Sequence, residues 1–181
     1  MADLHQDQGR KAVMEIALDL RNGLEGFPEN PPLAFRWLQA ASSDFDYPPA
    51  HFLYAQWIRD DDLFSLRSKD NPFVRPDNRQ GEYLMANSAL LHAADHHDIR
   101  AETEILRLLK AGPDYERRSW AIYYWLLRLE RHGTDVPANE LTTAKAKLPK
   151  DVQSMIETWD TSLLPAQPRQ RPPFTRLPAI P

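Results

Sequence analysis

Residues 86–101 read ANSALLHAADHHDIRA, and their pattern is the strongest indication of the fold that we expect for this chain. The alanines of this stretch recur at the spacing of one helix face as far as Ala94, and the polar residues DHHD then precede Ala101. Small residues on a helix face let a second helix approach closely, and a polar segment suits a reversal of the chain. We therefore interpret this stretch as the end of one helix, a turn over residues 95–98 and the start of another helix.

The same apolar period continues through most of the chain, and prolines interrupt it at the expected helix boundaries. No segment shows the sustained alternation and hairpin turns that are typical of β-strands. We predict an all-α fold of eight short helices. The predicted ranges are 10–24, 32–43, 50–60, 81–95, 98–111, 115–132, 137–147 and 150–160.

Two segments do not fit this helical pattern. Residues 60–79 (DDDLFSLRSKDNPFVRPDNR) are charged and contain two prolines, so we predict an inserted loop that either determines specificity or is simply solvated. Residues 161–181 are rich in proline, and we expect an extended tail that packs on the body or binds a partner. The predicted organisation is one helical domain over 1–160 followed by this tail.

Composition excludes several functional classes. The chain has no cysteine, which removes disulfides and thiol chemistry, and its net charge of −4 is accompanied by no basic strip for nucleic acid. The longest apolar runs are far below the roughly 18 residues that a membrane span needs. No leader is visible at the start, so we expect a cytoplasmic protein, or a periplasmic one if a signal peptide has been removed.

An internal repeat is visible in the starts of the predicted helices. Similar helix starts occur at Ala12, Ala50, Ala101 and Ala138, at steps of 38, 51 and 37 residues. The long middle step contains the insert at 60–79, and removing most of that insert restores a period in the high thirties. Such a period indicates helix hairpins that stack on their neighbours, because one hairpin cannot bury its apolar face alone.

The repeat resembles the Sel1-like repeat, a relative of the tetratricopeptide repeat. The first unit matches the pattern of that family at Ala12, Ile16, Ala17, Leu20, Gly23, Gly26, Phe27, Asn30, Ala34, Trp37 and Leu38. The segment AADHHDIRA (93–101) is similar to the junction between units, with His97 where the family usually has glycine. The resemblance covers residues 10–138, and 148–160 resembles a closing helix.

The resemblance implies a right-handed solenoid of about three hairpins, with a capping helix near 150–160 and the proline-rich tail. It further implies a non-enzymatic scaffold that binds one or more proteins. The most specific expectation is an immunity or inhibitor protein that blocks a secreted bacterial toxin or effector. A general adaptor in signalling or secretion is the second hypothesis, because one fold serves many functions.

A third hypothesis, from a different class, is a small metal-dependent hydrolase. His92 and His96 lie four residues apart, which suits two ligands on one helix face, and Asp95, His97 and Asp98 are close by. The repeat register places 95–98 in a turn instead, so we favour a polar turn over a metal site and expect no cofactor. No nucleophile elbow or glycine-rich phosphate loop occurs, so we expect no enzymatic activity.

The aromatic residues of the third unit have a structural and a functional interpretation. Trp120, Tyr123, Tyr124 and Trp125 follow Tyr115 closely, and they could form an interface hot spot. Helical spacing favours packing inside the hairpin, with Trp125 facing the core and Tyr123 facing outward.

The first helix of each hairpin lines the concave face in solenoids of this kind, so it supplies the candidate partner contacts. If Ala12, Ile16, Ala17 and Leu20 face inward, their neighbours face the open side. The candidate contact residues are Met14, Glu15 and Leu18, then Phe52, Leu53 and Gln56, then Thr103, Glu104 and Arg107.

Overall fold

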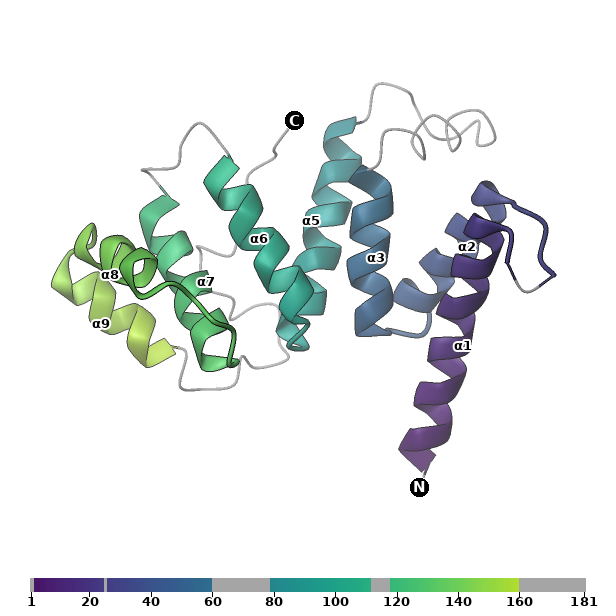
Figure 1. The fold of residues 1–181 in the computed structure, drawn as a ribbon, viewed down its shortest axis with the longest axis horizontal. Coiled ribbons are helices and arrows are strands. Elements are labelled where there is room, and N and C mark those ends of the chain that lie inside the picture. Colours follow the sequence, from purple (N-terminus) through teal and green to yellow (C-terminus); the bar gives the residue numbers. More distant parts are fainter. Residues whose placement is uncertain (1, 25, 60–78, 112–117, 160–181) are drawn as a thin grey trace. The chain divides into compact units, whose positions relative to one another are not determined.

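The computed structural model describes residues 2–24, 26–59, 79–111 and 118–159, which contain eight helices and no strand (Figure 1). The first four are α1 (Ala2–Asn22), α2 (Pro31–Ser43), α3 (Pro48–Arg59) and α5 (Arg79–Asp95). The others are α6 (Ile99–Ala111), α7 (Ser119–Arg131), α8 (Ala138–Ala146) and α9 (Lys150–Trp159). None of these helices is long and apolar enough to cross a membrane.

The prediction of an all-α chain is confirmed over the described residues, with helix ends within a few residues of those expected. The exception is α1, which begins at Ala2 rather than near residue 10. Tyr115, the predicted tail and nearly all of the predicted insert lie outside the described residues.

The chain divides into two compact units, one of residues up to Ala93 and one that starts at Ala94. Within each unit, helices that are consecutive in the sequence pack on one another: α1 on α2 and α2 on α3, then α6 on α7 and α7 on α8. Sequential packing of this kind is the arrangement expected of a helical repeat.

Alanines lie at the centre of the first unit. Ala17, Ala34, Ala41 and Ala50 are completely buried, so the backbones of α1, α2 and α3 can approach closely. Asn30 caps α2, because its side chain accepts a hydrogen bond from the backbone N–H of Leu33 at 3.1 Å. Two prolines follow in the first turn of α2, where a missing backbone N–H costs little.

The expectation that four residues of α1 face inward is only partly correct. Ala17 and Leu20 are buried, whereas Ile16 is half-buried and Ala12 is exposed. The helix α1 has 21 residues and α2 has 13, so the N-terminal half of α1 extends beyond the helix that covers it (Figure 1).

The centre of the second unit is α7. Its residues from Ala121 to Leu129 are all buried, because α6, α8 and α9 pack around it. Trp125 faces the core as predicted, with 1% of its surface exposed. The prediction for Tyr123 is wrong, since it is buried and its hydroxyl donates a hydrogen bond to Glu157 Oε1 at 2.8 Å. A helix covered on several sides has no open face for an outward tyrosine.

Candidate functional site

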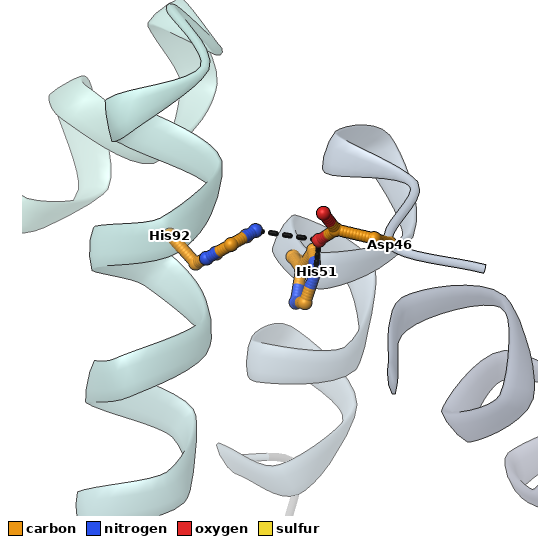
Figure 2. A group of neighbouring side chains, drawn as sticks. All are labelled: Asp46, His51 and His92. Atoms are coloured by element: carbon orange, nitrogen blue, oxygen red, sulfur yellow. Dashed lines mark hydrogen bonds and ion pairs between the residues drawn. The ribbon is translucent and has the colours of Figure 1, made fainter. Parts of the chain in front are cut away.

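A cluster of two histidines and one carboxylate is the most distinctive polar feature of the first unit (Figure 2). Asp46 lies in the turn between α2 and α3, where its φ is +50°. Aspartate is one of the few residues that tolerate this left-handed conformation. The turn is fixed on both sides, because Phe45 N–H donates to the carbonyl of Ala40 and Tyr47 N–H to that of Ala41, both at 3.1 Å.

The two histidines come from different helices. His51 lies in the first turn of α3 and His92 in the last turn of α5. Their Nε2 atoms lie 3.1 Å and 2.6 Å from the same Asp46 oxygen, Oδ1, to which they donate hydrogen bonds when protonated (Figure 2). The centroids of the two imidazole rings are 4.2 Å apart. His51 and His92, which are 41 positions apart in the sequence, therefore share one acceptor atom.

The environment of Asp46 favours its charged form. Partial burial opposes ionisation, but the hydrogen bonds and positive charge of His51 and His92 outweigh it and hold the pKa of Asp46 below its ordinary value. The carboxylate is thus ionised near neutral pH, with two imidazole nitrogens directed at it.

A cavity of about 250 Å³ adjoins the cluster. His51 and His92 form part of its wall, and the side chains of α2, α3 and α5 form the rest. The other lining residues are Gln39, Ser42, Ser43, Tyr54, Met85, Ser88 and Ala89. The cavity gives a small ligand or a partner side chain access to the imidazole rings.

The second unit contains a related group of residues around a buried carboxylate. Glu102 is 0% exposed, and its Oε1 accepts a hydrogen bond from Arg128 Nε at 2.6 Å. Its other oxygen lies 3.0 Å from His132 Nδ1, and Arg128 also donates to the backbone carbonyl of Ala94. Burial opposes the charge on Arg128, yet the hydrogen bond to Glu102 raises its pKa, so the guanidinium stays charged.

His97 completes this second group. It lies in the turn after α5 with φ +63°, and its ring meets that of His132 edge to face at 4.9 Å. Burial, together with the positive charge of Arg128 and the neighbouring His132, lowers the pKa of His97. His97 is therefore biased toward its neutral form.

The two groups occupy positions that correspond in the predicted repeat. His51 follows Ala50 and Glu102 follows Ala101, so they correspond to each other. His92 precedes the turn residue His97 by five positions, and Arg128 precedes Gly133 by five. Both His97 and Gly133 have positive φ. The predicted repeat thus aligns the Glu102–Arg128 pair of the second unit with His51 and His92, the two imidazoles on Asp46, in the first unit.

The predicted pairing of His92 with His96 is not the one that the structure builds. His92 is directed at Asp46, whereas His96 is exposed in the turn and belongs to neither group. Asp98 caps α6 instead of joining a site, because its Oδ1 accepts from the backbone N–H of Arg100 at 3.0 Å. The turn over residues 95–98 is therefore confirmed.

The nine predicted contact residues differ in exposure. Glu15, Gln56, Thr103 and Arg107 are exposed, and Met14, Leu18, Leu53 and Glu104 are half-buried. The prediction for Phe52 is wrong, since its side chain is 7% exposed and belongs to the buried face of α3. It faces the same side as Ala55 rather than the open side, so it is not available as a surface contact.

Several of these side chains pair with one another. Arg107 makes two hydrogen bonds to Glu104, at 2.7 and 2.6 Å, and Lys11 lies 3.1 Å from Glu15. Whether the set binds a partner stays a prediction.

Sequence reasoning did not identify Asp46 and His51 as site residues. No motif in the surrounding sequence identifies these two residues, because the cluster forms only when the turn after α2, the start of α3 and the end of α5 come together. The available signal was the predicted repeat, which aligns His51 with Glu102 one position after matching alanines.

Comparisons of the chain with models of known protein families, with curated proteins and with solved structures give no match.

Proposed function

We propose that this chain is a non-enzymatic scaffold that binds another protein, with the main contact surface on the first unit. The observation that carries the proposal is the distribution of exposed apolar side chains. Of nine large apolar residues exposed in the described part of the chain, seven lie in the first unit. These seven are Leu24, Phe27, Leu33, Trp37, Phe45, Leu84 and Met85.

Two of these residues lie on one side of α2. Leu33 and Trp37 are four positions apart, so they are neighbours on the helix surface, and 39% and 36% of their surfaces are exposed. Exposed apolar groups that cluster are typical of protein interfaces, and tryptophan is enriched among the residues that dominate binding energy. We name Leu33 and Trp37 the α2 pair.

We further propose that the helices form a right-handed Sel1-like solenoid of about three hairpins. The sequential packing of neighbouring helices supports this. The backbone at His97 supports it as well, because the position where the family has glycine adopts a left-handed φ of +63°. Gly133 has the corresponding conformation after α7.

The most specific form of the proposal is an immunity or inhibitor protein that blocks a secreted toxin. Its support is the Sel1-like resemblance together with an acidic scaffold and an unusual insert. A general adaptor is the alternative. A hydrolase that uses His92 and His96 has less support, because these two histidines belong to different local environments.

The test is affinity capture from the source cells, with the full chain as bait and mass spectrometry of the retained proteins. A chain carrying Leu33→Ser and Trp37→Ser serves as the disrupted bait, and Met155→Ser, which changes a similarly exposed residue of α9, is the matched control. We expect wild type and control to retain one protein in stoichiometric amount, and the disrupted bait to lose it.

The nature of the retained protein separates the two forms of the proposal. A single secreted toxin would support an inhibitor, and several signalling or envelope proteins would support an adaptor. Retention of nothing by the wild-type chain, or equal retention by the disrupted bait, would overturn the assignment of the contact surface to the α2 pair.

A further inference from the structure

We propose that Asp46, His51 and His92 bind a divalent metal ion of the zinc class. This inference is independent of the proposed scaffold function. It rests on the positions of three ligand atoms, Asp46 Oδ1, His51 Nε2 and His92 Nε2, which all lie within 4.8 Å of one another (Figure 2).

The distances fit the coordination shell of such an ion. Zinc binds imidazole nitrogen and carboxylate oxygen at about 2.0–2.1 Å, which places neighbouring ligand atoms of a tetrahedron about 3.3 Å apart. The Oδ1 of Asp46 is 3.1 Å from one imidazole nitrogen and 2.6 Å from the other. An ion can therefore replace the protons shared by these three atoms after small movements of the side chains.

The chemistry of the donor set indicates the class of ion. Two imidazoles and one carboxylate suit zinc and its neighbours in the first transition series, whereas magnesium and calcium prefer oxygen ligands. Three protein ligands leave one position of a tetrahedron open. The cavity of about 250 Å³ beside His51 and His92 gives a water molecule or a small ligand access to that position.

The ligands also connect separate segments of the first unit. Asp46 follows α2, His51 begins α3 and His92 ends α5, so a bound ion would link all three. An ion that binds only the folded arrangement stabilises it, and the melting temperature should rise with metal concentration.

The equivalent group in the second unit does not offer the same site, although His97, Glu102 and His132 are also close together. Glu102 is already neutralised by Arg128 at 2.6 Å, and that guanidinium would repel a cation. This group therefore supplies internal controls for the experiment.

The experiment uses the full chain without a histidine tag, stripped with a chelator and then titrated with Zn²⁺ by calorimetry. Co²⁺ replaces Zn²⁺ in a parallel titration, followed by visible absorption. We expect one ion per chain and a loss of affinity of at least about tenfold in each of Asp46→Asn, His51→Ala and His92→Ala. The control variants His96→Ala and His97→Ala should stay within about twofold of wild type.

Absence of saturable binding would overturn the proposal. The same holds if His97→Ala or His132→Ala abolishes binding while His51→Ala does not. Because a ligand variant can fail to fold, circular dichroism accompanies each titration, and X-ray absorption of the zinc-loaded wild type gives a second measurement. Two imidazole ligands on the ion would support the site, and one or none would refute it.

Discussion

The Nε atom of Arg128 lies 2.6 Å from the Oε1 atom of Glu102, and both side chains are almost completely buried. The pair joins α6 to α7, and Arg128 also reaches the backbone of Ala94. The predicted repeat aligns these two positions with His51 and His92 of the first unit, which meet on Asp46. If this alignment holds, the same two positions carry a structural ion pair in one unit and two of the three candidate metal ligands in the other.

Removal of one member of the buried ion pair should be costly. Glu102→Ala leaves the Arg128 guanidinium buried without its counter-charge, and we expect a loss of about 3–5 kcal/mol in the free energy of unfolding. Urea denaturation followed by circular dichroism measures this. The control is Glu104→Ala, which breaks an ion pair with the exposed Arg107 and should cost less than about 1 kcal/mol. Equal losses in the two variants would contradict the structural role of Glu102.

Replacement of both members should recover part of that loss. In the double variant Glu102→Leu with Arg128→Met no charge is buried, so its destabilisation should be smaller than the sum of the two single effects. The double-mutant cycle is measured by the same denaturation experiment. Strict additivity would show that the two side chains do not interact.

The start of α6 depends on Asp98. Its carboxylate accepts from the backbone N–H of Arg100 at 3.0 Å, so Asp98→Ala should lower the free energy of unfolding by about 0.5–2 kcal/mol. Asp98→Asn retains an acceptor oxygen and should stay close to wild type. If both variants lose the same amount, the charge of Asp98, which also binds the Arg100 side chain at 2.7 Å, matters more than the cap.

Stability should fall in mild acid because of His97. Its folded-state pKa lies below the usual 6.5, because burial, Arg128 and His132 lower it and the nearby His96 lowers it further, while the charge of Glu102 acts in the opposite direction. Unfolding therefore takes up a proton at pH values between this lowered pKa and 6.5. The stability that neutral His97 provides is present above pH 6.5 and is lost as the pH falls through the lowered pKa.

The test compares wild type with His97→Asn, which removes the titration but tolerates positive φ. Denaturation midpoints at about pH 7.5 and about pH 5 should show that wild type loses more stability than the variant. Parallel losses would mean that other groups cause the acid sensitivity.

The helices could be predicted from the sequence because their signals are local. Prolines mark the beginnings of α2 and α3, and the alanine period marks α5 and α6. The inward direction of Trp125 followed from helical spacing for the same reason.

Side-chain environments that depend on several helices could not be predicted in this way. Tyr123 is buried because α9 brings Glu157 to its hydroxyl. The sequence of residues 119–131 alone does not predict that contact. Phe52 was placed on the open side by the predicted repeat register, whereas it is 7% exposed and lies in the core around α3.

Only one residue of the candidate metal cluster, His92, was identified from the sequence. His92 was singled out because His96 lies four residues after it. Its neighbours in the structure are Asp46 and His51, which lie in the turn after α2 and at the start of α3. Asp46 and His51 are unremarkable until the turn after α2 brings them together, since their proximity is a property of the packed hairpin.

The contact between the α2 pair and the protein partner is the core of the proposed function. Its most direct test is the affinity of the captured partner for Trp37→Ala, measured by calorimetry beside the control Met155→Ala, with circular dichroism to confirm that both variants are folded. We predict that Trp37→Ala weakens binding by at least about tenfold and that Met155→Ala changes it by less than about threefold. Unchanged affinity in Trp37→Ala, with a loss in Met155→Ala, would contradict the claim and move the contact surface to the second unit.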